Sequence, residues 1–161
     1  MDDALNRFID LASDATSSQL FAELHSMCDT LVGVKLFTCS SFDFVTGKAE
    51  RIYTSDPEAY PLTGLKNIVP NRWTELVIDS RKPFLAKNIS ELRDIFSDHE
   101  KIEDLGLGAA INLPIFLSNR LLGTLNLLHE NGYYSELDVR LLRMAALPAI
   151  VTFLAHDIPR A

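Results

Sequence analysis

Two apolar segments joined by a short polar turn constrain the fold more than any other part of this sequence. They are Ala109–Leu117 and Leu121–His129, with Ser118-Asn119-Arg120 between them. Their lengths and their content of branched aliphatic residues predict two neighbouring β-strands. Each strand carries one asparagine near its middle, Asn112 or Asn126. An amide buried without a partner costs about 1–3 kcal/mol, so the pair predicts the polar floor of a cavity for a small molecule.

The length and charge of the chain limit the classes of protein to which it can belong. A chain of 161 residues with 47% hydrophobic and 23% charged residues is typical of a single globular domain. We therefore expect one domain over residues 1–161, with its core over residues 14–155. The net charge of −7 disfavours binding to nucleic acid or to a membrane, because both need basic surface patches.

The chain shows no pattern for secretion, membrane insertion or metal binding. The acidic N-terminus MDDALNRFIDLA lacks the basic start and unbroken apolar segment of a secretory signal. The longest apolar run, Met144–Leu154, is too short to span a bilayer and contains Pro148 and Thr152. Cys28 and Cys39 form no CxxC motif and no metal-ligand spacing, which favours two small buried apolar residues. We expect a cytoplasmic protein without a metal site.

Helices are predicted at both ends of the chain. Apolar residues recur at helical spacing over residues 2–12 and again over residues 20–31, as one bent helix or two short ones. Thr16-Ser17-Ser18 supplies an N-cap cluster, and Gly33 is typical of a C-terminal cap. Near the other end, a capping box at Ser135 starts a helix that reaches Ala155, with a kink at Pro148.

The middle of the chain alternates short strands and short helices. Strands are predicted over Val34–Phe44, Ala49–Ser55 and Pro83–Ala86, and helices over Arg72–Ser80 and from a cap at Ser90 onward. With the hairpin at 109–129, this order predicts an α+β fold with a central antiparallel sheet of about five to six strands. The terminal helices would cover one face of the sheet. The short helices and loops would cover a pocket on the other face.

The second half of the chain has a distinctive order of motifs. Ile111-Asn112-Leu113-Pro114-Ile115 is followed by a turn, by Leu121-Leu122-Gly123-Thr124-Leu125-Asn126-Leu127, by Tyr133 and Tyr134, and by a C-terminal helix. In this order the chain resembles the GAF domain family, which has a strand ending in proline, a turn, a leucine–glycine strand, an aromatic residue and a helix. The resemblance covers residues 14–155. It implies a sensory module that holds a small organic ligand between the sheet and the middle helices.

The resemblance also implies partners. Family members bind cyclic nucleotides, bilins, haem or small organic acids, so the ligand stays open and no cofactor is assigned. Most members precede a kinase, phosphodiesterase, cyclase or transcription-activation domain, and a separate signalling protein is a candidate partner here. GAF domains commonly pair through their terminal helices, so we expect a homodimer. The terminal helices also carry more apolar residues than one sheet face is expected to cover, namely Phe8, Leu20, Leu24, Leu141 and Leu142.

An enzyme on the same scaffold is the alternative. The free methionine-(R)-sulfoxide reductases of this family use cysteines located before the short strand and before the fourth strand. Leu65–Lys82 and Asp94–Gly108 contain no cysteine, and Cys28 and Cys39 lie elsewhere. We therefore expect a signalling module with no catalytic residues of its own. A redox or hydrolytic enzyme that uses His99 or a thiol stays open, as does a scaffold protein with a filled cavity.

Eight residues are candidates for the ligand site. Strand alternation places Thr124 and Asn126 on one face of their strand, and Asn112 joins them if the faces coincide. The alternative is that both amides satisfy backbone groups in loops. Trp73, the only tryptophan, would form a stacking wall or pack in the core.

The remaining candidates come from a polar cluster and from aromatic residues. Asp98 and His99 would contact an anion or act in acid–base chemistry, or else simply cap a helix. Apolar walls would come from Tyr53 and Phe84, and also from Phe37, which is additional to the eight.

Overall fold

The hairpin over residues 109–129 forms the centre of the sheet in the computed structural model, which describes residues 2–159. Its strands are β5 (Ala109–Leu117) and β6 (Arg120–His129). The turn contains only Ser118 and Asn119, one residue fewer than predicted. Their φ values are 49° and 65°, the left-handed backbone conformation that two-residue hairpin turns favour.

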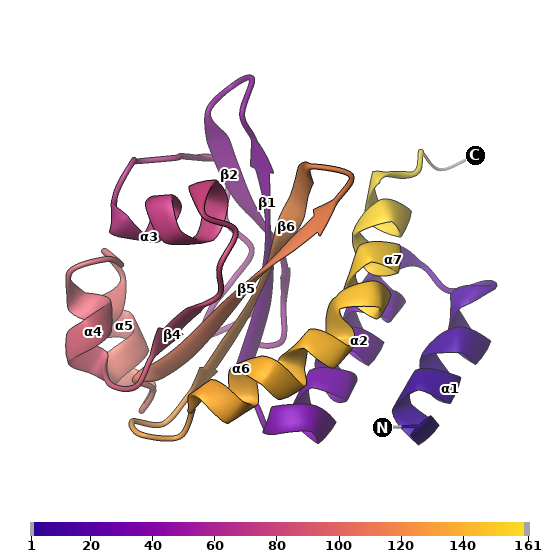
Figure 1. Ribbon diagram of the computed structural model, residues 1–161, viewed down its shortest axis with the longest axis horizontal. Coiled ribbons are helices and arrows are strands. Elements are labelled where there is room, and N and C mark those ends of the chain that lie inside the picture. Colours follow the sequence, from indigo (N-terminus) through magenta and orange to yellow (C-terminus); the bar gives the residue numbers. More distant parts are fainter. Residues whose placement is uncertain (1, 160–161) are drawn as a thin grey trace.

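Four further strands extend the hairpin into a six-stranded antiparallel sheet with the order β3-β2-β1-β6-β5-β4 (Figure 1). They are β1 (Leu36–Asp43), β2 (Lys48–Thr54), β3 (Lys66–Asn67) and β4 (Phe84–Ala86). The predicted α+β fold with five to six strands is confirmed. The short β3 was not predicted, because the prolines and the glycine around it are typical of a loop.

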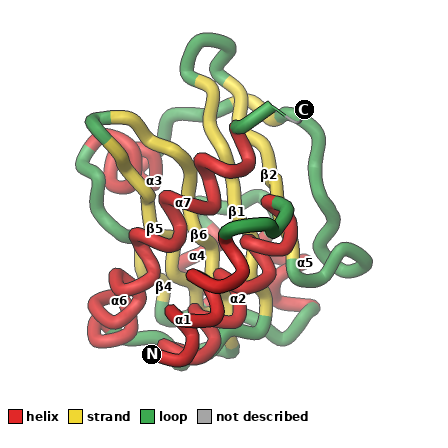
Figure 2. The backbone as a smooth tube through the Cα atoms, turned by 90° about the vertical axis from the view of Figure 1, so that its right-hand side faces the viewer, coloured by secondary structure: helices red, strands yellow, loops and turns green. Residues whose placement is uncertain are grey.

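The terminal helices cover one face of this sheet, as Figures 1 and 2 show. They are α2 (Ser17–Val32), α6 (Glu136–Leu142) and α7 (Ala146–Asp157), whereas α1 (Asp2–Ala12) packs against α2. The N-terminal segment forms two helices, because Thr16 starts α2 with a complete capping box. A 3-10 turn over Arg143–Ala145 separates α6 from α7. It lies just before Pro148, close to the predicted kink.

The main core lies between these helices and the sheet. Cys28 and Cys39 are both free and buried in it, as expected for small apolar residues. Most of the apolar side chains that we expected at a dimer contact are instead buried in this core. Phe8, Leu20, Leu24 and Leu142 are buried within the chain, so only Leu141 of that group is exposed.

A middle layer of short elements covers the other face. It consists of α3 (Arg72–Thr74), a π-helical turn (Glu75–Asp79), α4 (Ile89–Arg93) and α5 (His99–Asp104). Asn71 caps α3, because its side-chain oxygen accepts from the Thr74 amide at 3.0 Å. The cap of α4 is Asn88, which accepts a hydrogen bond from the Glu91 amide, so the predicted cap Ser90 lies inside the helix. A second apolar cluster packs beneath this layer.

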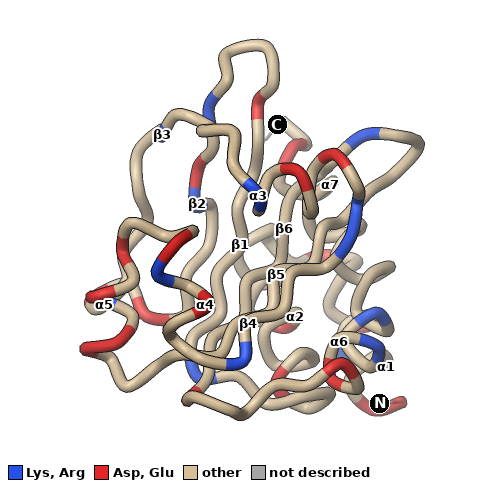
Figure 3. Tube along the Cα trace, turned by 60° about the vertical axis from the view of Figure 1, so that its left-hand side comes forward, with Lys and Arg blue, Asp and Glu red and all other residues tan. Residues whose placement is uncertain are grey.

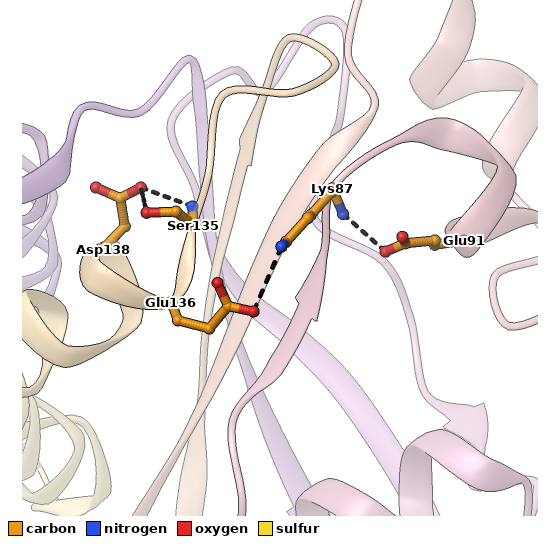
Figure 4. A network of polar contacts seen from close by, with 5 residues as sticks. All are labelled: Lys87, Glu91, Ser135, Glu136 and Asp138. Carbon is orange, nitrogen blue, oxygen red and sulfur yellow. Dashed lines mark hydrogen bonds and ion pairs between the residues drawn. The ribbon is translucent and has the colours of Figure 1, made fainter.

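Polar contacts connect the middle layer to the terminal helices at the end of β4 (Figure 4). The Lys87 backbone amide donates to Glu91 in α4 at 2.8 Å, and its ammonium pairs with Glu136 in α6 at 3.4 Å. Ser135 and Asp138 form the predicted capping box at the start of α6. No helix within residues 2–159 combines the length and apolar character that a membrane crossing needs.

Candidate functional site

A cavity of about 280 Å³ lies between the sheet and the middle layer. Strands β1, β2, β5 and β6 form its floor, and α3, α5 and two loops form its walls. The lining residues that define its chemistry are Thr38, Ser40, Phe42, Arg51, Tyr60, Lys66, Trp73, Phe96, Asp98, Asn112, Thr124 and Asn126.

The floor of the cavity is a network of side-chain hydrogen bonds. Asn112 lies opposite Asn126 in the β5–β6 ladder, and its amide donates to the Asn126 oxygen at 2.9 Å. The Thr124 hydroxyl donates to the same oxygen at 3.0 Å. The Asn126 amide in turn donates to the hydroxyls of Thr38 and Ser40 on β1, at 3.2 and 3.1 Å. The two amides therefore satisfy each other and the hydroxyls across three strands, rather than loop backbone.

An aromatic wall stands over this floor. The Trp73 indole nitrogen donates to the Asn112 oxygen at 2.9 Å, which fixes the ring at the edge of the network. The ring centroid of Trp73 lies 6.1 Å from that of Phe42 and 6.4 Å from that of Phe96. At these separations the three rings form a connected apolar surface. Trp73 is thus both half-buried in packing contacts and part of the cavity lining.

A β-bulge positions Arg51 at the cavity. Ser40 on β1 pairs with Arg51, whereas the preceding Cys39 pairs with Tyr53, so Ile52 is the extra residue on β2. A bulge of this kind changes which face each side chain occupies. Ile52 and Tyr53 both pack against the main core, and Arg51 lines the cavity.

The loop after β2 closes one side of the cavity through Tyr60. Its hydroxyl donates a hydrogen bond to Asp98, and its backbone oxygen accepts from Thr54 at 2.6 Å. The Arg51 guanidinium lies 3.8 Å from the Tyr60 ring centroid and donates to the Pro61 oxygen at 2.6 Å. Burial and the Asp98 charge raise the pKa of Tyr60, so the phenol stays protonated and keeps donating to Asp98.

The structure brings together five of the eight predicted site residues. Those that line the cavity are Trp73, Asp98, Asn112, Thr124 and Asn126. His99, Tyr53 and Phe84 are not among its lining residues.

The structure places each of these three residues in a different environment outside the cavity lining. His99 begins α5 beside Asp98 but lies outside the cavity, and its Nδ1 has no hydrogen-bond partner within the described chain. Phe84 packs against Phe96 at 6.2 Å, in the apolar cluster beneath the middle layer. Placing Tyr53 in the pocket was wrong, because the bulge turns it toward α2, where it stacks on Phe21 at 5.5 Å. Phe37 lies on that same face.

Several lining residues were not predicted. Strand alternation over Val34–Phe44 could have found Thr38, Ser40 and Phe42, which share one face of β1. Arg51 could not be found in this way, because its position depends on the bulge. Tyr60 lies in a loop whose course no periodic pattern specifies.

The cavity carries charges of both signs. Arg51, Lys66 and the exposed Glu50 come from β2 and β3, and Asp98 comes from the start of α5. Figure 3 shows basic residues on β2 and β3 and several acidic residues along α4 and α5. Within residues 2–159 no cluster of potential metal ligands is present. Burial raises the pKa of both thiols, Cys28 and Cys39, and neither lines the cavity.

Comparisons with solved structures find the same fold. The GAF domain of a two-component sensor histidine kinase from Bacillus halodurans is 14% identical, with a TM-score of 0.66 over 86% of this chain and 94% of that one. A GAF domain/HD domain protein from Geobacter sulfurreducens is 10% identical, with a TM-score of 0.70 over 91% and 98%. The phycoerythrobilin-bound GAF domain of a cyanobacterial phytochrome is 19% identical, with a TM-score of 0.65 over 97% of each chain.

The sequence itself gives the family. None of the curated proteins compared with the chain matches it. Residues 22–149 match the sequence profile of the GAF domain, which is most of the chain and includes every strand of the sheet. The chain belongs to the GAF domain family.

Proposed function

We propose that this protein is a sensory GAF module that binds a small organic molecule in the cavity and has no catalytic activity of its own. The observation that carries the proposal is the cavity itself, whose floor of amides and hydroxyls lies beside an aromatic wall. A concave site with a few convergent polar groups and apolar walls is typical of ligand-binding proteins. The likeness to a phycoerythrobilin-bound GAF domain and to one from a sensor kinase supports it.

The size of the cavity limits the ligand. Its volume of about 280 Å³ lies just below the range of about 300–1,000 Å³ that is usual for drug-sized ligands. We therefore propose a compact ligand with one apolar face and a few polar groups. The five ligand-site residues of the proposal are Trp73, Asp98, Asn112, Thr124 and Asn126.

The terminal helices offer a route for the signal to leave. Gly123 lies next to Thr124 on β6 but on the opposite face of the sheet, where a Cβ atom would stand 2.4 Å from the Phe153 ring of α7. The floor of the cavity and α7 are therefore separated by a single strand backbone. A ligand that shifts Thr124 or Ser40 would also move the surface on which the Phe153 ring packs, because closely packed cores transmit small displacements.

The outer surface of α6 and α7 supports the proposed homodimer. Apolar side chains recur there at intervals of three and four residues and are 37–75% exposed in the single chain. They are Leu137, Leu141, Met144, Leu147, Val151 and Leu154. This spacing is typical of helices that pair along a common stripe. A second copy of the same stripe would cover it, and altered pairing would then carry the signal to a separate partner protein.

The proposed location is the cytoplasm. Two free buried thiols, Cys28 and Cys39, agree with a reducing compartment, in which disulfides are rare.

Native mass spectrometry of freshly purified protein tests the proposal, because it reports a retained ligand and the subunit number together. Trp73 is the only tryptophan, so its fluorescence reports occupancy of the cavity during titration with a library of metabolites. The Trp73→Phe variant is the control, since it removes that signal while keeping a ring in the wall. Absence of a retained ligand, together with no fluorescence change and no thermal shift across the library, would contradict the proposal.

A further inference from the structure

Two cations of the cavity lack a carboxylate partner. Within residues 2–159, neither Arg51 nor Lys66 takes part in an ion pair, although five other basic residues do. Two carboxylates, Asp98 and Glu50, line the same cavity but form no ion pair with either cation. Asp98 accepts the Tyr60 hydroxyl, and Glu50 is exposed at the edge of β2.

Arg51 is held in place but retains unused donors. Its guanidinium stacks on the Tyr60 ring and donates to the Pro61 oxygen. A guanidinium has five N–H donors in a planar fork, and one contact to a carbonyl uses only part of that capacity. The stacking fixes the plane of the fork, which lowers the entropy lost when it binds a ligand. Arg51 is thus preorganised for a planar anion.

The aromatic wall and the hydroxyl groups of the cavity suit the rest of such a ligand. Trp73, Phe42 and Phe96 provide apolar ring surface, and the Trp73 indole nitrogen donates to Asn112. The hydroxyls of Thr38 and Ser40 accept from Asn126, so their own protons are available to an acceptor. A molecule with an anionic end and an apolar body would match both Arg51 and the aromatic wall.

We propose that the ligand is a small organic monoacid, whose carboxylate binds Arg51 and whose apolar body lies against Trp73 and Phe96. The inference rests on the function proposed above and specifies its ligand class. Arginine binds carboxylates through two parallel N–H···O bonds, a geometry that an amide or an amine cannot reproduce. Asp98 and Glu50 also line the cavity, and their negative charges oppose a second anionic group on the ligand, which favours one carboxylate over two.

Calorimetric titration with matched probes tests this inference. The probes are benzoate, phenylacetate and indole-3-acetate, each paired with its own amide, and benzylamine as the cationic counterpart. We expect acids to bind at least about tenfold more tightly than their amides. The Arg51→Gln variant should weaken binding of the acids by about ten- to hundredfold and leave binding of the amides unchanged. Unchanged amide binding also shows that the variant cavity is intact.

Arg72→Gln is the matched control, because it removes the same charge from an exposed residue of α3 outside the cavity. It should leave the preference for acids intact. If amides or benzylamine bind as well as the acids, the inference is wrong and the proposed function stands. If Arg51→Gln weakens acids and amides equally, Arg51 only shapes the cavity through Tyr60, and the inference is again wrong. If no probe binds while native mass spectrometry or the metabolite titration finds a ligand, the inference is wrong and the proposed function stands. If those measurements also find no ligand, both proposals are contradicted.

Discussion

At the scale of single residues, Asn126 is the centre of the cavity floor. It accepts two side-chain hydrogen bonds and donates two. Asn126→Ala would leave the donors of Asn112 and Thr124, both buried residues, without their acceptor. We expect the free energy of unfolding to fall by about 2–3 kcal/mol, measured by urea denaturation. Asn67→Ala is the control, because it removes an amide from an exposed position on β3, and a loss of equal size there would contradict the argument.

Two histidines make the stability of the protein depend on pH. The His25 ring stacks on Phe37 with centroids 5.2 Å apart. Burial lowers the pKa of His25, despite the opposing charge of Asp29, and burial likewise lowers the pKa of His129. The unfolded chain therefore binds more protons below its histidine pKa of about 6.5. The stabilisation is complete above that value and is lost as the pH falls toward the folded pKa.

We expect the free energy of unfolding to decrease between about pH 7.5 and about pH 5.5. The His25→Phe variant, which keeps a ring against Phe37, should show a shallower decrease. His156→Gln, at an exposed position of α7, should leave the slope as it is. Denaturant unfolding across this range measures the slopes, and a stability that is flat or rises on acidification in the unmodified protein would refute the prediction.

At the scale of elements, the sequence predicted what local patterns encode. The hairpin strands, the N-cap cluster at Thr16 and the capping box at Ser135 follow from periodicity and turn chemistry, so they were found within a few residues. The bulge at Ile52 was not found, because it depends on how β2 meets β1 rather than on its own residues. This explains why Asn112 and Asn126 were correctly brought together, whereas Tyr53 was assigned to the wrong face.

The packing of α7 on β6 makes its own prediction at this scale. A Cβ atom on Gly123 would stand 2.4 Å from both the Phe153 ring and the Ser40 backbone oxygen. Because neither the ring nor the strand can yield freely, Gly123→Ala should lower the free energy of unfolding by about 1–3 kcal/mol. Gly64→Ala is the control, since a Cβ there meets nothing within 4 Å. Equal stability of the two variants in urea would show that α7 adapts without cost.

At the scale of the whole molecule, the sequence could not separate covered from uncovered apolar residues. Phe8, Leu20 and Leu24 have the same periodicity as the residues of α7 but are buried within the chain. Which helix side is buried depends on the order in which α1, α2 and α7 stack (Figure 2). The stripe from Leu137 to Leu154 therefore became visible only in the folded chain, and it gives the dimer proposal a defined surface.

That surface permits a direct test of the dimer. Leu147 and Val151 are 75% and 45% exposed in the single chain, so the double substitution Leu147→Glu, Val151→Glu should leave folding intact. In a twofold dimer each change occurs twice at the same interface, and we expect association to weaken by at least roughly a hundredfold. Sedimentation velocity over a range of concentrations measures this loss. Leu62→Glu, at a 58% exposed loop position, is the control and should remain dimeric. If the unmodified protein is monomeric, or if the double variant still dimerises, the stripe does not mediate self-association. The signal would then have to leave α7 through contact with a different partner.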